Sequence, residues 1–228
     1  MVKFDHIIHF VNQLDSVGTE GVLPIHSGGK HEPLGTANLL SYFDQRYVEY
    51  LAIDDEERFR RHLEAAEDSF AKTIDQVQYE EGFIRCALAT EEIHQLADRY
   101  RAKGFRTVGP VDMERTTNGE TIRWKLLYIL DDKETLPFFI QWEEAESARL
   151  DRIRNLRGGF ISPEINIHHE VKNGKVWEAF FDVIGVWKGE VDAHTTITIA
   201  ENEKPSITLE VAMDGESAIY KGAVYKFI

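Results

Sequence analysis

The chain has 228 residues, of which 43% are hydrophobic and 29% charged, enough apolar material for one large domain or two small ones. Its formal net charge of −14 disfavours nucleic acid, which needs a basic partner, and also disfavours anionic lipid. A single cysteine, Cys86, excludes an internal disulfide and a thiolate metal cluster.

The N-terminal segment has the composition of a strand rather than of a signal peptide, and no apolar run is long enough to cross a membrane. We therefore expect a cytoplasmic protein that has neither a membrane nor a nucleic acid as its partner.

The first 54 residues predict a β-α-β-β-β unit. Residues 3–11 are rich in β-forming side chains, and alternation along this strand places His6 on one face and His9 on the other. A short helix or turn is expected over 12–20. Three further strands are expected, over 22–26, 36–43 and 47–53.

The same pattern returns after a charged segment, residues 55–78, whose apolar residues have helical spacing and predict one connecting helix. Residues 79–143 then predict a second unit of one strand, one helix and three strands, at 82–89, 90–103, 105–110, 122–130 and 137–143. The chain thus contains an internal repeat.

The last part of the chain predicts a helical linker over 144–163 and a third β-α-β-β-β-like unit over 164–228. The expected elements of this unit are a strand, a helix and three strands, at 164–171, 176–184, 193–200, 206–213 and 218–227.

Several motifs resemble the glyoxalase-like domain proteins of the vicinal oxygen chelate superfamily. They are G-G-K-H-x-x-x-G-T-A-N from Gly28, Y-V-E-Y-L from Tyr47, the opening F-D-H-I-I-H-F-V, T-I-R-W from Thr121 and P-F-F-I-Q-W from Pro137. In that superfamily two modules pair and their sheets curl around a cleft. The resemblance therefore implies an α+β fold in which the repeated modules of residues 1–143 form a cup.

The resemblance also implies four corner positions in the cup, on the first and last strand of each module: His6, Glu49, Arg85 and Gln141. An imidazole, a carboxylate and an amide oxygen at His6, Glu49 and Gln141 would hold one divalent metal, such as Zn, Ni, Mn or Fe. Arg85 departs from the pattern, because a guanidinium has no lone pair to give to a metal.

Arg85 leaves two further interpretations open. It could replace the metal as the positive charge of the cup and bind an anionic ligand. Alternatively, Arg85 and Glu49 could satisfy each other across the cup, with no ligand involved.

Other polar residues are candidates for binding or proton transfer. Glu49 and His31 are the candidate proton carriers, although His31 could also be an ordinary loop histidine. Asn38 interrupts an apolar strand and is a candidate ligand contact together with His31, Arg85 and Trp124, whose ring could instead belong to the core.

The leading functional hypothesis is a glyoxalase-like protein that binds a small polar or anionic molecule and transforms it by lyase, isomerase or dioxygenase chemistry. The alternative is a metal-free small-molecule binding protein of the bleomycin-resistance type, and a third reading is an interaction scaffold with a vestigial cup. The third unit has no partner module, so it is expected to pack on the first pair or to form a two-fold homodimer.

Overall fold

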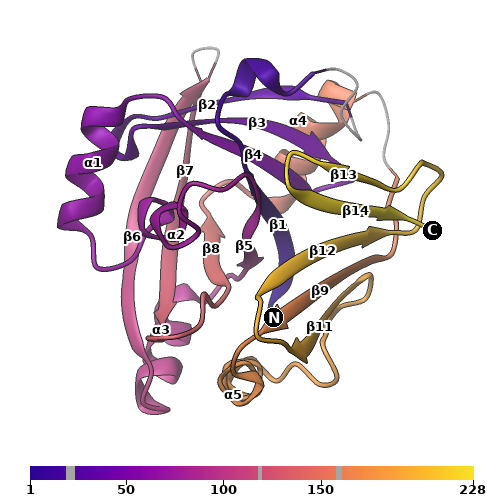
Figure 1. Ribbon diagram of the computed structural model, residues 1–228. Coiled ribbons are helices and arrows are strands. Elements are labelled where there is room, and N and C mark those ends of the chain that lie inside the picture. The colour runs from indigo at the N-terminus through magenta and orange to yellow at the C-terminus, as the bar shows by residue number, and fades with distance from the viewer. Residues whose placement is uncertain (19–23, 118–119, 158–160) are drawn as a thin grey trace.

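The computed structural model describes residues 1–18, 24–117, 120–157 and 161–228, and it contains two β-sheets (Figure 1). The larger sheet has eight strands in the order β2-β3-β4-β1-β5-β8-β7-β6. Their bounds are Lys3–Phe10 (β1), His26–His31 (β2), Thr36–Tyr42 (β3), Tyr47–Ile53 (β4), Gly82–Ala89 (β5), Arg106–Thr117 (β6), Glu120–Leu130 (β7) and Phe138–Trp142 (β8).

This sheet consists of two halves with the same pairing. In the first half β1 runs parallel to β4, in the second β5 runs parallel to β8, and the halves meet where β1 pairs antiparallel to β5. The predicted α+β fold with two paired modules in a curled sheet is therefore confirmed.

The first module differs from its prediction between β1 and β2. The described part of the predicted helix at 12–20 holds only a 3₁₀ turn, Leu14–Ser16. Of the predicted strand at 22–26, residues 22 and 23 lie outside the described residues, and β2 begins at His26.

Alternation along β1 separates two hydrophobic cores. Ile8 and Phe10 face the concave side of the sheet, with Leu51, Ala87 and Phe138. Ile7 and Val11 face the convex side, with Cys86 and Leu88. Because both faces are covered, the strand is buried from Phe4 onward, as its apolar composition predicts.

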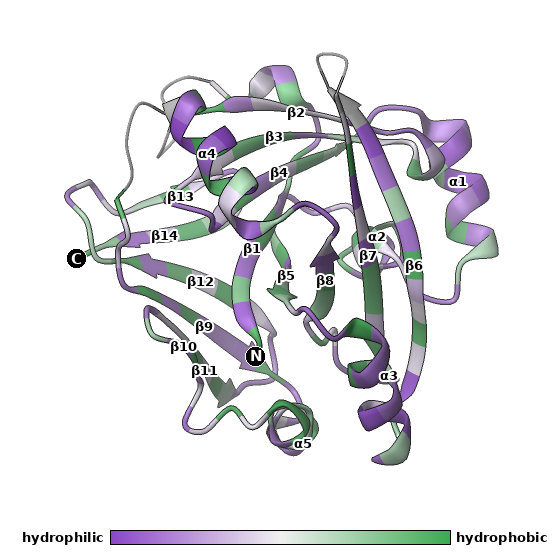
Figure 2. Cartoon of the chain, turned by 180° about the vertical axis from the view of Figure 1, so that it is seen from behind, coloured by the Kyte–Doolittle hydropathy of each residue, from purple (hydrophilic) through white to green (hydrophobic). Residues whose placement is uncertain are grey.

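The segment between the modules forms two helices, α1 (Glu56–Ala65) and α2 (Phe70–Gln76), and the single predicted helix is wrong. The Ser69 side chain accepts a hydrogen bond from the Lys72 N–H and so begins a new helix. Figure 2 shows α1 as largely hydrophilic. By contrast, α2 buries Phe70, Ala71 and Ile74 against the concave face.

Two further helices flank the second module. α3 (Ile93–Ala102) packs its apolar side, including Leu96 and Tyr100, into the convex core. α4 (Glu146–Arg157) follows β8 and leads to the third unit. None of the helices in the described part of the chain is both long and apolar enough to cross a membrane.

The third unit forms a six-stranded sheet in the order β10-β11-β9-β12-β14-β13, with one helix, α5 (Gly174–Ile184). The strand bounds are Ile165–Val171 (β9), Glu190–Asp192 (β10), Thr195–Glu201 (β11), Ser206–Val211 (β12), Ala218–Tyr220 (β13) and Ala223–Phe227 (β14). The predicted strand at 218–227 is thus divided in two, because Lys221 and Gly222 both have positive φ and reverse the chain.

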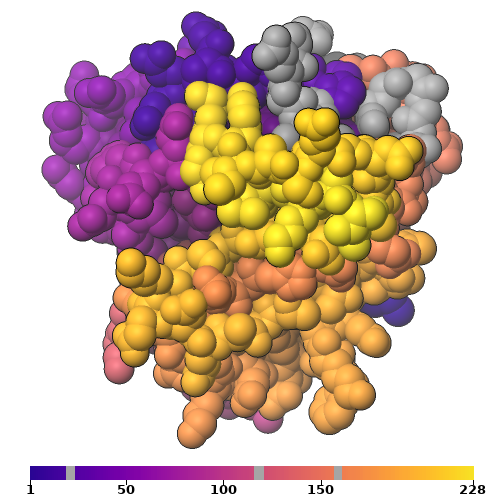
Figure 3. Space-filling view, turned by 45° about the vertical axis from the view of Figure 1, so that its right-hand side comes forward, coloured from indigo at the N-terminus to yellow at the C-terminus, as the bar shows by residue number. Residues whose placement is uncertain are grey.

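This third unit packs on the convex face of the larger sheet, and each sheet covers the apolar face of the other. One continuous core contains Ile7 and Leu88 of the large sheet together with Ile167 and Leu209 of the small one. The last strands form a broad patch over one face of the molecule (Figure 3). Of the two predicted arrangements, packing within the chain is therefore the one observed.

Candidate functional site

A small cavity lies between the two modules, on the concave face, and we call it the inner cavity. Its volume is about 20 Å³, room for roughly one water. The first module contributes polar side chains from each of its four strands, whereas the second contributes mostly aromatic and aliphatic ones. The lining residues are His6, His31, Asn38, Tyr47, Glu49, Phe70, Arg115, Trp124, Leu126, Phe138, Ile140 and Trp142.

A β-bulge in β1 brings the neighbouring residues Asp5 and His6 together. The pairing with β5 shifts register between Phe4 and His6, which leaves Asp5 without a cross-strand partner. Asp5 Oδ1 and His6 Nδ1 are 2.7 Å apart, and Asp5 Oδ2 accepts hydrogen bonds from Arg149 Nη1 and Trp142 Nε1, both at 2.9 Å. Burial would raise the pKa of Asp5, but the Arg149 charge and the His6 contact lower it to about 2.

Glu49 occupies the centre of the polar side of the inner cavity. Its Oε1 accepts a hydrogen bond from Asn38 Nδ2 at 2.6 Å, and its Oε2 lies 3.3 Å from His6 Nε2. The latter contact is an ion pair without hydrogen-bond alignment, so His6 Nε2 is a buried nitrogen that makes no hydrogen bond.

The protonation states of this pair follow from its contacts. Burial would raise the pKa of Glu49, but the interactions with His6 outweigh it and lower that pKa to about 2. Burial would lower the pKa of His6, but the interactions with Asp5 and Glu49 raise it above its ordinary value. Glu49 is therefore ionised at neutral pH, and its negative charge favours the protonated form of the neighbouring His6 imidazole.

His31 is part of the buried wall rather than a histidine of a solvated loop. Only 3% of its surface is exposed, its Nδ1 is 3.1 Å from Thr36 Oγ1, and its Nε2 is 4.0 Å from Glu49 Oε1. Burial, with the nearby charge of Arg115, lowers the pKa of His31 to about 4. Its imidazole is therefore neutral at neutral pH.

Arg115 is a residue of the inner cavity that the sequence interpretation missed. It lies on β6, is buried, and donates a hydrogen bond from Nη1 to Asn38 Oδ1 at 3.4 Å. The predicted strand ended at residue 110, whereas β6 continues to Thr117. Extending the strand would have placed Arg115 on the same face as the apolar residue Met113, two positions earlier.

Arg85 is buried, but its partners are not those expected. Its guanidinium pairs with Asp68 at 3.1 Å and donates to the Leu136 carbonyl at 2.6 Å and to Thr73 Oγ1 at 3.1 Å. Glu49 is not among these partners, and Arg85 does not line the inner cavity. The interpretation in which Arg85 and Glu49 satisfy each other is therefore wrong, because the segment that holds α2 supplies the compensating carboxylate.

Gln141 lies on the opposite side of the sheet from the predicted metal ligands. Its Oε1 accepts a hydrogen bond from the Ile93 N–H at 3.0 Å, at the beginning of α3. The flanking residues Ile140 and Trp142 line the inner cavity instead. Gln141, the predicted metal ligand of β8, thus lies one position away from the residues of this strand that face the inner cavity.

The donor set does not fit a divalent metal. Within the described residues, no group of three or more His, Cys, Asp or Glu side chains is arranged to hold a metal ion. His6 and Glu49 remain as a pair, and Arg115 adds a positive charge to the same cavity, which disfavours a cation. No step is therefore assigned to a metal.

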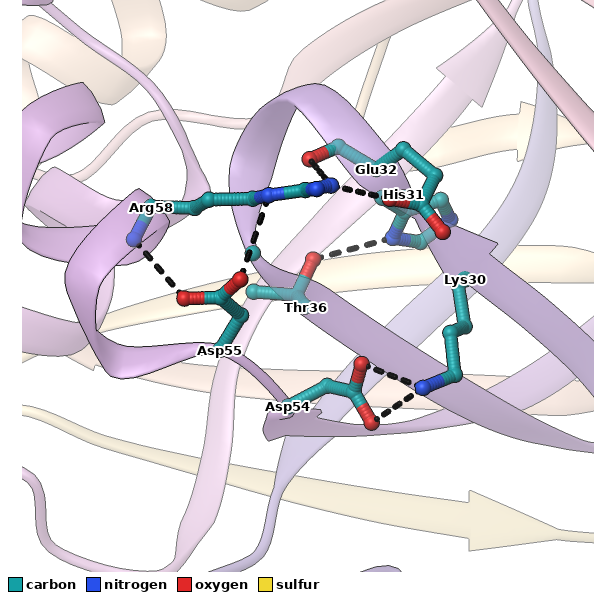
Figure 4. A pocket seen from close by; sticks show the side chains of 8 residues that line it. Lys30, His31, Glu32, Thr36, Asp54, Asp55 and Arg58 are labelled. Carbon is teal, nitrogen blue, oxygen red and sulfur yellow. Dashed lines mark hydrogen bonds and ion pairs between the residues drawn. The ribbon is translucent and has the colours of Figure 1, made fainter.

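A second, larger hollow of about 330 Å³ lies on the other side of His31, and we call it the outer cleft (Figure 4). Lys30 pairs with Asp54 at 2.7 Å, and Arg58 pairs with Glu32 and Asp55. His31 is the residue common to both linings, so the outer cleft and the inner cavity adjoin at this position.

Comparison with known proteins gives a family and a fold. A family model described as a glyoxalase-like domain matches residues 4–165. The crystal structure of a hypothetical protein from Staphylococcus aureus has 28% identity, with a TM-score of 0.86 over 100% of this chain and 99% of that one. No curated protein matches the chain at a significant level.

More distant structures share the fold alone. The Mn(II)-bound glyoxalase from Novosphingobium aromaticivorans has 14% identity and a TM-score of 0.51, over 92% of this chain and 65% of that one. A mutant of 4-hydroxymandelate synthase from Streptomyces coelicolor has 10% identity and a TM-score of 0.55, over 93% and 71%.

Proposed function

Because the chain belongs to the glyoxalase-like domain family of the vicinal oxygen chelate superfamily, we propose that its cup binds one small polar molecule without a metal. One observation carries this proposal. Four polar side chains, one from each strand of the first module, converge on a cavity whose other walls are mainly apolar, and this is the usual composition of a small-molecule site. The four are His6, His31, Asn38 and Glu49.

In this proposal His6 is the group that moves a proton. A general acid or base works best when its pKa lies near the working pH. The pKa of Glu49 is about 2 and that of His31 about 4, so both are weak bases at neutral pH. The pKa of His6 is instead raised by Asp5 and Glu49, so this lining residue is the one that favours its protonated form and can donate a proton to an oxygen of the bound molecule. Such chemistry belongs to an isomerase or lyase.

A binding protein that does not transform its ligand is the second candidate. The weak basicity of Glu49 and His31 favours it, because neither group would readily remove a proton from carbon. The two candidates differ in one measurable outcome: NMR spectra of a bound ligand change with time if it is transformed and stay constant if it is only held.

The metal-free proposal is tested by elemental analysis. The protein is purified without a metal-binding tag, exposed to zinc, nickel, manganese or iron, and dialysed, with the variant His6→Ala/Glu49→Ala treated in parallel. We expect neither protein to retain stoichiometric metal. Stoichiometric metal in the wild type that is absent from the variant would overturn the proposal.

The homodimer remains a proposal of its own. β13 is the edge strand of the smaller sheet, and 77% of the surface of Ile219 on it is exposed. An exposed edge with an apolar side chain can pair with its own copy across a two-fold axis. Light scattering should give twice the chain mass for the wild type and less for Ile219→Lys, whereas a wild-type monomer would contradict the proposal.

A further inference from the structure

Arg115 differs from the other buried arginines of the described chain in having no carboxylate partner. Arg46, Arg85 and Arg149 each pair with an aspartate, at 2.7, 3.1 and 2.9 Å. Arg115 is only 8% exposed, yet no described carboxylate lies within 4.0 Å of its guanidinium. A buried charge without a counter-ion is costly, and a native structure that retains one requires an explanation.

The hydrogen bonds of Arg115 are also incomplete. Its Nε is buried and makes no hydrogen bond, and its one described bond is the 3.4 Å contact with Asn38 Oδ1. Glu49 does not serve as its counter-ion, because its Oε1 accepts from Asn38 and its Oε2 faces His6. The inner cavity is therefore bordered by a guanidinium whose Nε has no partner among the described residues.

We propose that Arg115 is the anion-binding residue of the inner cavity and that the ligand of the cup is a small carboxylate. This inference rests on the proposed function and names the class of its ligand. A carboxylate matches the planar fork of a guanidinium and can accept two parallel hydrogen bonds from it. The apolar walls formed by Trp124, Leu126 and Phe138 then surround the carbon skeleton.

A second buried nitrogen, Nε2 of His6, further restricts the chemical class of the ligand. His6 lines the same cavity, and its buried Nε2 makes no hydrogen bond with any described residue, although it lies 3.3 Å from Glu49 Oε2. A ligand that satisfies both Arg115 and His6 carries a second oxygen close to its carboxylate, as 2-hydroxy and 2-oxo acids do. The ligand is short, because the inner cavity as it stands has room for about one water. A two- or three-carbon acid therefore enters only when lining side chains, such as those of Phe70 and His31, move outward.

The test uses pairs of probes that differ only in charge: glycolate and glycolamide, lactate and lactamide, pyruvate and pyruvamide. Binding to the wild type, Arg115→Met, Arg115→Lys and Arg123→Met is measured by ligand-observed NMR and calorimetry. Arg123 is the control, since it lies on β7, is exposed and pairs with Glu114. We expect at least one acid to bind the wild type and Arg123→Met, and to bind Arg115→Met about tenfold or more weakly. Arg115→Lys should lie between them.

The outcomes separate this inference from the proposed function. Amides that bind as tightly as acids, or acids that bind Arg115→Met unchanged, would overturn the role of Arg115 and leave a polar ligand in the cup. Failure of every acid and every amide to bind would overturn both.

A measurement without ligand gives an independent check. Removing an uncompensated buried charge should raise the melting temperature of Arg115→Met by about 2–4 °C, with no change for Arg123→Met. A lower melting temperature for Arg115→Met would show that the arginine is structural and would overturn the inference.

Discussion

His31 lines both the inner cavity and the outer cleft, and its neutral, buried imidazole makes stability depend on pH. The folded-state pKa of about 4 lies below the ordinary value of 6.5. As the pH falls, the unfolded chain takes up a proton first, so this contribution to stability is complete above pH 6.5 and is lost between pH 6.5 and 4. The pKa values of Asp5 and Glu49 are about 2, so the contributions of these two carboxylates to stability are lost only below about pH 4.

Replacing this histidine by glutamine should therefore flatten the pH profile. In the wild type, His31 alone should reduce the free energy of unfolding by about 2 kcal/mol between pH 7 and pH 5. Between pH 7 and pH 5 the free energy of unfolding of His31→Gln should fall by about 2 kcal/mol less than that of the wild type, as measured by urea unfolding. The pKa values of His9 and His169, lowered by burial to about 4 and 3, leave a remaining slope common to both proteins. A pH profile of His31→Gln that is unchanged from the wild type would contradict this assignment.

At the scale of elements, α4 supports the cup through one side chain, Arg149. Its Nη1 pairs with the buried Asp5 at 2.9 Å and its Nη2 donates to the Gln45 carbonyl at 2.9 Å. The guanidinium also stacks 4.6 Å from the ring centroid of Trp142. Through Asp5, the linker helix holds His6 in position.

Arg149→Met should destabilise the protein by about 3–5 kcal/mol, because it leaves the Asp5 carboxylate buried without its counter-ion. Arg152, also on α4, forms a partly buried pair with Glu144, which precedes the helix, and Arg152→Met should cost about 0–1 kcal/mol. The double variant Arg149→Met/Asp5→Asn should recover much of the loss. Denaturant unfolding measures all three, and equal losses for Arg149→Met and Arg152→Met would refute the role given to Arg149.

α2 closes the cup, and its first residue is the part that touches the inner cavity. The ring of Phe70 meets that of Phe138 edge to face at 5.2 Å and lines the cavity. Phe70→Ala should lower the free energy of unfolding by about 3–5 kcal/mol and enlarge the cavity, so that longer ligands bind. Phe59→Ala on α1 removes an equally buried ring outside the cavity. It should cost a similar amount, and a similar widening of ligand size in this control would contradict the specific role of α2.

The sequence could predict features that depend only on neighbouring residues, such as the face of a strand to which a side chain points. Alternation on β1 correctly separated His6 from His9, since strand geometry fixes it. His31, Asn38, Glu49 and Trp124 all line one cavity, while their roles in binding or proton transfer stay predictions.

The errors concern long-range partners and the exact face of a short strand. Nothing in the local sequence indicates that Asp68 would neutralise Arg85 rather than Glu49. In β8 a shift of one position decides whether Gln141 or Ile140 faces the cavity. Arg115 was missed because β6 was predicted to end several residues too early.

At the scale of the whole molecule, the third unit and the cup share one core and direct polar contacts. His9 on β1 bonds through Nδ1 to Tyr225 Oη at 2.7 Å and through Nε2 to the Lys221 carbonyl at 2.9 Å. Arg46, in the turn between β3 and β4, donates to the carbonyls of Pro163 at 2.8 Å and His194 at 3.0 Å. These contacts join the convex face to the small sheet, and the core between them is built from residues of both parts.

The two parts should therefore unfold together. Trp124 and Trp142 lie in the cup and Trp177 in the third unit, so variants that keep only the cup tryptophans or only Trp177 report on each part separately. Their urea transitions should coincide, as a single cooperative unit requires.

Tyr225→Ala opens a cavity at the junction between the two parts. It should lower the free energy of unfolding by about 3–5 kcal/mol and shift the urea midpoints of both reporters equally. Trp187, 73% exposed, provides a control whose replacement by alanine should shift neither midpoint. A Tyr225→Ala variant in which the Trp177 transition moves and the cup transition stays would show that the cup is stable without the third unit.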